Sequence, residues 1–146
     1  MSRIACTAEL ANLPVLLGMV ADMCQREHID DATRHDLQLI VEEACVNVMH
    51  HAYPTGQLGL LALELRVVQE EGGPRRAVLT LEDQGRAFDP LSLAAPDTTE
   101  PLEARPTGGL GVHLIRQLSN RQHYQRHPRL GNVFTIEKNL APPAPH

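Results

Sequence analysis

The chain has 146 residues, of which 42% are hydrophobic, 21% are charged and 3% are aromatic. This size and composition predict a single globular domain whose core is built from aliphatic side chains. The formal net charge of −5 and the absence of a lysine and arginine cluster argue against nucleic acid as a direct partner.

The three cysteines, Cys6, Cys24 and Cys45, are widely spaced and form no CxxC pair. This spacing indicates neither a disulfide framework nor a zinc site. Cys24 and Cys45 lie within apolar helical patterns, which predicts that they are small core residues. The sequence shows no charged-then-apolar leader and no apolar run long enough to span a bilayer. We therefore expect a cytoplasmic protein without a membrane partner.

In chain order, the pattern predicts a short edge strand at residues 3–6 and then a helix at 12–28. Asn12 is a suitable N-cap for this helix, and Pro14 stands in its first turn, where proline is tolerated. Asp30 and Asp31 start a second helix, which runs to about residue 52.

The second helix carries an apolar stripe at helical spacing, so we expect it to pack against a core. The residues of the stripe are Leu37, Ile40, Val41, Ala44 and Val48.

The second half of the chain predicts strands, a long loop and one more helix. Strands at 58–68 and 77–81 are expected to pair antiparallel through a glycine-rich turn. Prolines punctuate a loop at 86–107, and a helix with Val112, Ile115 and Leu118 on its core side follows at 108–118. A closing hairpin at 121–126 and 133–138 precedes a tail at 141–146, which we expect to be disordered. This order predicts an α+β domain at 1–140, with a sheet covered on one face by helices.

Three short motifs carry polar groups of interest. Glu43 and Asn47 stand one helical turn apart and project from the same side, next to the apolar stripe. Buried polar groups of this kind need partners, although the same pattern also fits a half-exposed polar edge. Asp83 and Gly85 follow a strand, where the carboxylate can accept a hydrogen bond from an exocyclic amine; Asp-x-Gly is also ordinary turn chemistry.

The third motif is a run of glycines, Gly108, Gly109 and Gly111, at the start of a helix. The N–H groups of a helix N-terminus can hold a phosphate, and glycines permit close backbone approach. Glycines before a helix are also common as simple turn residues. The chain has no GxxxxGK[ST] sequence, which excludes the common phosphate loop.

The order and spacing of the three motifs resemble the GHKL ATPase superfamily, which includes gyrase-type ATPases, the heat-shock chaperone ATPase and histidine kinase catalytic domains. The fuller segments at 43–53, 83–90 and 108–115 look like the anti-sigma-factor serine-protein kinases of bacterial partner-switching systems. The resemblance covers about residues 10–140. It implies a Bergerat fold, which is a two-layer sandwich with a mixed, mostly antiparallel sheet.

The resemblance also implies ATP and Mg²⁺ as cofactors and gives each polar residue a role. Asn47 would coordinate Mg²⁺ through its carboxamide oxygen. Glu43 would act as general base on the incoming hydroxyl or water. Asp83 would accept the adenine amine, with Gly85 making room for the ring. The segment 86–107 would form a lid over the phosphates.

Further nucleotide-binding residues follow from the same resemblance: Phe88, Arg105, Thr107, Gly108, Gly109, Leu110, Gly111, Val112 and Thr135. Arg105 reads equally well as a solvated loop arginine. The sequence departs from the superfamily where Ala87 replaces a glycine and where Asn132 stands in place of a threonine that helps to bind adenine through water. Either Asn132 or Thr135 is expected to take over that function.

Three functions remain open at this point. The first is a protein serine/threonine kinase that phosphorylates a STAS-type anti-sigma-factor antagonist and sequesters a sigma factor or similar regulator. The second is a non-catalytic module whose partner affinity depends on bound ATP or ADP. The third is a plain ATPase or a histidine kinase fragment. Relatives of the first kind commonly dimerise, so a homodimer is a candidate assembly. His51 and Tyr53 are expected to pack and to end their helix.

Overall fold

The computed structural model of the chain describes residues 1–54, 56–92 and 109–142. Its strands are β1 (Ser2–Thr7), β2 (Leu60–Gln69), β3 (Arg75–Asp83), β4 (Arg121–His127) and β5 (Gly131–Asn139). Its helices are α1 (Leu13–Arg26), α2 (Asp31–His51) and α3 (Gly109–Leu118), with short 3₁₀ turns at Leu10–Asn12 and Pro90–Ser92.

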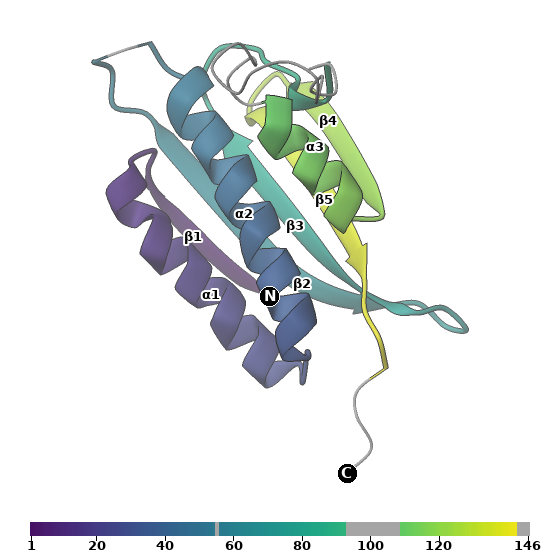
Figure 1. The fold of residues 1–146 in the computed structure, drawn as a ribbon. Coiled ribbons are helices and arrows are strands. Elements are labelled where there is room, and N and C mark those ends of the chain that lie inside the picture. Colours follow the sequence, from purple (N-terminus) through teal and green to yellow (C-terminus); the bar gives the residue numbers. More distant parts are fainter. Residues whose placement is uncertain (55, 93–108, 143–146) are drawn as a thin grey trace, which may run out of the picture.

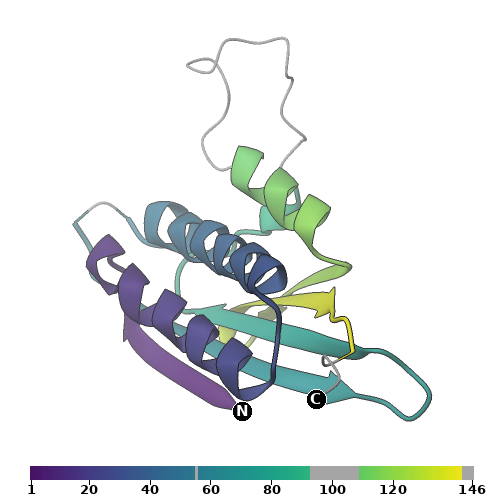
Figure 2. The same cartoon turned by 60° about the horizontal axis from the view of Figure 1, so that its bottom comes forward.

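The described strands form one sheet in the order β1-β2-β3-β5-β4. All helices cover the same face of this sheet, so the molecule has two layers (Figure 1, Figure 2). This arrangement confirms the predicted α+β sandwich. One detail differs from the prediction of a mixed sheet, because every pairing between the described strands is antiparallel.

Each predicted element is present, and its ends lie within about two residues of the expected positions. The predicted hairpin of β2 and β3 is confirmed by nine paired residues, from Leu61 opposite Asp83 to Gln69 opposite Arg75. Most of the predicted loop, at 93–107, and the last four residues of the predicted tail lie outside the described residues.

The two helix starts are built differently. Asp30 caps α2 as expected, because its carboxylate accepts hydrogen bonds from the backbone N–H of Thr33 at 3.3 Å and from the Thr33 hydroxyl at 2.6 Å. Asn12 occupies the N-cap position of α1 but makes no capping bond. Its amide donates instead to the carbonyl and hydroxyl oxygens of Thr7, at 2.9 and 2.8 Å. The preceding 3₁₀ turn satisfies the backbone N–H of Leu13, and Pro14 at the second position of the helix has no N–H for a cap to bind.

The core lies between α1, α2 and the helix-facing side of the sheet. The stripe predicted on α2 is buried from Leu37 to Ala44, and Cys24 and Cys45 are buried as expected. Val112 and Ile115 of α3 are likewise buried, and Leu118 packs against the core. Within the described residues, no helix is long and apolar enough to cross a membrane.

The start of β5 approaches the end of β3 very closely at Gly131. This residue has a φ of +79°, and a Cβ at its position would overlap the backbone carbonyl of Asp83. The position therefore requires glycine both for its conformation and for the lack of a side chain. Gly18, in the middle of α1, is the opposite case, because a Cβ there meets nothing within 4 Å.

These two glycines give a matched pair of stability predictions. Gly131→Ala is expected to destabilise the fold by about 2–4 kcal/mol, since it adds steric overlap to a strained φ. Gly18→Ala is expected to stabilise it by about 0.5–1 kcal/mol, since alanine has the higher helix propensity. Urea unfolding of the two variants measures both effects. Equal urea midpoints for the two variants would contradict the close contact between Gly131 and the Asp83 carbonyl.

Candidate functional site

The turn that follows β3 is held by Tyr53 and Arg126, which come from two other parts of the chain. Tyr53, just after α2, accepts a hydrogen bond from the backbone N–H of Gln84 at 2.9 Å, and its hydroxyl donates to the carbonyl of Leu60. Arg126 on β4 donates to the carbonyl of Gly85 at 2.7 Å. The turn is therefore fixed relative to α2 and to the β4–β5 hairpin. Tyr53 does more than the packing and helix termination expected from the sequence.

Asp83, the last residue of β3, is buried next to this turn, with only 6% of its surface exposed. Its Oδ1 accepts hydrogen bonds from the backbone N–H of Gly85 at 2.9 Å and from the amide of Asn132 at 2.8 Å. Burial raises the pKa of the Asp83 carboxyl, while these two donors and the nearby Arg126 oppose the rise. Among the described residues, no hydrogen bond reaches Oδ2.

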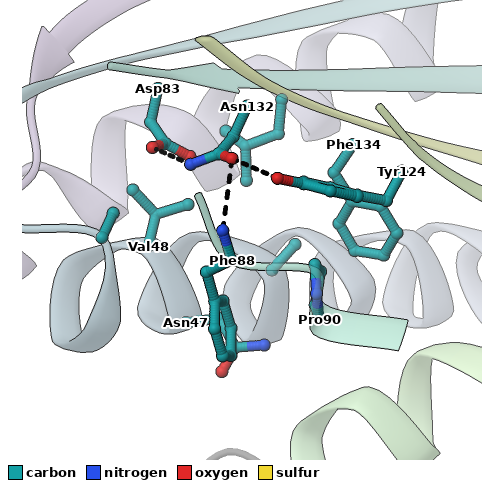
Figure 3. A pocket seen from close by; sticks show the side chains of 11 residues that line it. Asn47, Val48, Asp83, Phe88, Pro90, Tyr124, Asn132 and Phe134 are labelled. Carbon is teal, nitrogen blue, oxygen red and sulfur yellow. Dashed lines mark hydrogen bonds between the residues drawn. The ribbon is translucent and has the colours of Figure 1, made fainter. Parts of the chain in front are cut away.

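Asn132, opposite Asp83 in the β3–β5 ladder, is 4% exposed and binds four groups. Its amide donates to Asp83 and, at 2.7 Å, to the carbonyl of Arg86. Its carbonyl oxygen accepts from the Tyr124 hydroxyl and from the backbone N–H of Phe88 at 3.4 Å. Figure 3 shows the bonds that join the carboxamide to Asp83, Tyr124 and Phe88.

A cleft opens beside this network, between α2 and the ends of β3, β4 and β5. Its polar lining comes from Asn47, Asp83 and Asn132. Its apolar walls come from Val48, Leu81, Phe88, Pro90, Tyr124 and Phe134 (Figure 3). A flat apolar slot with a few polar groups suits a heteroaromatic base. The cavity measures about 30 Å³ in this conformation, which is smaller than a purine, so binding a base requires the walls to separate.

Asn47 on α2 lines the cleft, and the nitrogen of its carboxamide has no partner within the described part of the chain. The side chain is 7% exposed, and its Nδ2 finds no hydrogen-bond acceptor among the described residues. A buried amide without a partner is costly unless a ligand completes its bonds. Rotation of the carboxamide exchanges its oxygen and nitrogen, so the group fits a role as an oxygen ligand to Mg²⁺. The described residues contain no cluster of three or more His, Cys, Asp or Glu that is placed to hold a metal. An ion here would therefore share Asn47 with phosphate and water oxygens.

Glu43 lies one turn before Asn47, and its carboxylate packs against the first turn of α3. A Cβ on Gly111 would overlap the Glu43 Oε2. The structure thus brings together two of the three sequence motifs, with an acidic group against a glycine-rich helix start. Partial burial, and to a smaller extent the neighbouring charge of Glu42, raise the pKa of Glu43.

Four other predicted site residues lie in the described part of the chain with their side chains. Phe88 lines the cleft, and Val112 is buried in the core. Gly85 packs against α2, because a Cβ there would overlap the Ala52 carbonyl, so its need for glycine comes from the approach to the helix. Thr135 does not line the cleft: it lies between Phe134 and Ile136, which face the core, and therefore points to the opposite face of β5.

The structure describes the remaining predicted residues only in part or not at all. Arg105, Thr107 and Gly108 fall in the segment 93–108, outside the described residues. Gly109 and Leu110 form the first residues of α3, and only their backbone is described.

Tyr124, Phe134, Ala44 and Ala52 also line the cleft, and the sequence motifs do not predict them as site residues. Tyr124 stands in a short, polar strand that shows no hydrophobic alternation. The register of β4 against β5 places it opposite Phe134 and within reach of Asn132. Only that pairing identifies Tyr124 as a cleft residue.

The chain matches the histidine kinase-like ATPase domain over residues 6–138. It is 30% identical over 109 residues to the serine/threonine-protein kinase BtrW of Bordetella bronchiseptica, covering 75% of this chain and 72% of that protein. It is 33% identical over 90 residues to the serine-protein kinase RsbW of Halalkalibacterium halodurans, covering 59% of this chain and 51% of that protein. The chain thus spans about half the length of this RsbW relative.

The chain belongs to the histidine kinase-like ATPase family. Within it, these two relatives are named a serine/threonine-protein kinase and a serine-protein kinase. Membership in this family implies the use of ATP. The names of the relatives confirm the predicted class, protein serine/threonine kinase.

Solved structures agree on the fold. A crystal structure of RsbU and RsbW domains from Mycobacterium tuberculosis superposes with a TM-score of 0.58 at 16% identity, over 99% of this chain and 34% of that chain. A blue-light activated histidine kinase from Erythrobacter litoralis gives 0.51 at 18% identity, over 89% of this chain and 41% of that one. Both structures resemble this chain in fold alone.

The raised pKa of Asp83 predicts a pH-dependent choice of base. ADP offers a 6-amino donor to the ionised carboxylate, whereas inosine diphosphate offers a 6-oxo group. As pH falls through the pKa of Asp83, the carboxyl becomes protonated, and the preference for ADP is expected to drop by about 10- to 100-fold. The usual pKa of aspartate is near 3.9. Because the pKa of Asp83 is raised, the drop begins at a higher pH than for an ordinary aspartate.

Calorimetric titration with each diphosphate at a series of pH values measures this preference. The ratio of the two affinities cancels the titration of the phosphates, which both ligands share. A ratio that stays constant on acidification down to the unfolding limit would contradict the role of Asp83.

Proposed function

We propose that this chain transfers the γ-phosphoryl group of ATP to a serine or threonine of a small STAS-type antagonist protein. When it is not phosphorylating the antagonist, the chain would bind a sigma factor or a similar regulator and thereby sequester it. The observation that carries the proposal is the position of Glu43, an acidic side chain held against the N-terminal turn of α3 beside the base cleft.

The adenine base would lie in the cleft, with Asp83 as the acceptor for its 6-amino group. The aromatic and aliphatic walls of the cleft supply the apolar contact that a base requires. Oδ1 of Asp83 is already occupied by two protein donors, so Oδ2 is the atom that faces the amine. Phe88 and Val48 would flank the ring.

The phosphates would lie toward α3, where backbone N–H groups at the helix start attract anions. Asn47 would hold Mg²⁺ through its carboxamide oxygen, and the ion would neutralise the phosphate charge. Glu43 would accept the proton of the incoming hydroxyl. Its raised pKa suits this role, since a base works best when its pKa approaches the working pH.

Two other functions remain as alternatives. A module that only binds ATP or ADP has no use for a carboxylate at the position of Glu43. A plain ATPase would direct the same base at water. An assay of phosphoryl transfer from γ-labelled ATP separates these functions, because it follows both the labelled protein and the released phosphate. A homodimer is compatible with all three functions.

The kinase proposal predicts a selective loss of phosphoryl transfer in Glu43→Gln. This variant keeps the shape of the side chain and removes the base, so transfer to a purified STAS-type antagonist is expected to fall by about 10²–10⁴-fold. Gly111→Ala is expected to lower the rate as well, because its methyl group displaces the Glu43 carboxylate. Glu43→Gln should bind ADP within about twofold of the wild type, since Glu43 does not line the base cleft.

Transfer is measured with γ-labelled ATP, and the exposed variant Glu71→Gln serves as a control for loss of one acidic charge. Acid-stable label on the antagonist supports the proposal. Acid-labile label, phosphate release without labelled protein, or ATP bound without turnover would each replace it with one of the other functions.

The proposed metal ligand gives a separate prediction. Mg²⁺ is expected to strengthen ADP binding to the wild type, and Asn47→Ala is expected to lose that gain while retaining metal-free binding. Asn47→Asp should restore the gain, since a carboxylate oxygen is a better ligand for a hard cation. Calorimetric titrations with Mg²⁺ and with EDTA measure the difference. An equal gain in Asn47→Ala would remove Asn47 from the metal site.

A further inference from the structure

The carboxamide of Asn132 has no bonding capacity left for a ligand. An asparagine amide offers two donors and two acceptor lone pairs. All four are used within the protein, by Asp83, the carbonyl of Arg86, the hydroxyl of Tyr124 and the backbone N–H of Phe88. The role expected from the sequence, a water-mediated contact with adenine, therefore has no free atom at this residue.

We propose that Asn132, oriented by Tyr124, is a positioning residue that presets the Asp83 carboxylate and thereby determines the choice of base. This inference rests on the proposed role of Asp83 as the acceptor of the adenine amine. Neither Asn132 nor Tyr124 acts on the phosphates or on the transferred group.

The orientation of the carboxamide follows from its backbone partners. The carbonyl of Arg86 can only accept a hydrogen bond, and the N–H of Phe88 can only donate one. The NH₂ group must therefore face Arg86 and Asp83, and the oxygen must face Phe88 and Tyr124. A flipped amide would leave two backbone groups unpaired and would point a carbonyl oxygen at a buried carboxylate.

The electrostatic balance of Asp83 depends on this neutral donor. Among the described residues, Arg126 from β4 and Tyr53 from the end of α2 are ionisable groups near the carboxylate, and Tyr124 from β4 is joined to it through Asn132. Within the described residues, none of them forms an ion pair with Asp83; the Arg126 guanidinium donates to the Gly85 carbonyl. The amide of Asn132 and the N–H of Gly85 are thus the direct donors that favour the ionised form against burial.

Selectivity follows from how the two oxygens of Asp83 are used. Oδ1 is held by Asn132 and Gly85, which fixes the plane of the carboxylate. Oδ2 then presents an ionised acceptor to the cleft. Such an acceptor favours a 6-amino group and repels a 6-oxo group. A carboxylate that rotates or becomes protonated loses this discrimination.

The test is Asn132→Asp, which keeps the shape of the side chain, removes the donor and adds a like charge. We expect the pH midpoint for the preference for ADP over inosine diphosphate to rise by about one unit or more. At a pH between the wild-type midpoint and that of the variant, the preference itself should be lower in the variant, by up to about tenfold. Gln125→Glu, on the exposed side of β4, is the matched control for added charge and should leave both values unchanged.

A second variant guards against failure of Asn132→Asp to fold. Tyr124→Phe keeps the aromatic wall and removes only the hydroxyl that orients the amide, so it should shift the midpoint in the same direction by a smaller amount. A residue that only stabilises the fold would weaken both diphosphates alike and leave the pH midpoint in place; that result in either folded variant overturns the proposal.

The wild type separates this failure from failure of the proposed function. If the wild type shows no preference for ADP at any pH, Asp83 is not the base acceptor, and the proposed function fails at the cleft. If the wild type prefers ADP and the variants retain its midpoint and preference, only the positioning role is wrong.

Discussion

The pairing of Asp83 with Asn132 at the end of the β3–β5 ladder is the constraint on which the rest of the site depends. It places a carboxylate and a carboxamide in direct contact at the edge of an apolar core. Gly131 makes the approach of the strands close enough, since any side chain there would meet the Asp83 backbone. This contact also helps to fix the position of the turn after Asp83.

Polar groups inside the sandwich differ in whether the protein satisfies them. Asn132 has every bond it can make, whereas the Nδ2 of Asn47 has no partner among the described residues. A buried amide that is saturated holds its neighbours in place, whereas one with an unused donor leaves a position that a ligand can complete. The two buried asparagines therefore suit different roles, and the proposed metal ligand is the unsaturated one.

Helix α2 joins the core to the site. Its apolar stripe from Leu37 to Ala44 is buried against the sheet, and the adjacent side carries Glu43 and Asn47. Because these two faces adjoin on one helix, packing of the stripe determines where the polar groups stand. Contact of Glu43 with Gly111 then joins α2 to α3, and the two helices lie on the same face of the sheet (Figure 1).

The sequence by itself determined the elements, the two-layer architecture and the family, because hydrophobic periodicity and motif order are local properties of the chain. It also singled out Glu43, Asn47 and Asp83 as candidate site residues, because they stand in recognisable motifs. The bonding role of Asn132, the place of Tyr124 in the cleft and the position of Thr135 on the far face were decided by the tertiary structure. Each of these depends on strand register, and a shift of one residue would exchange the two faces of β5. No local pattern in these short polar strands carries that information.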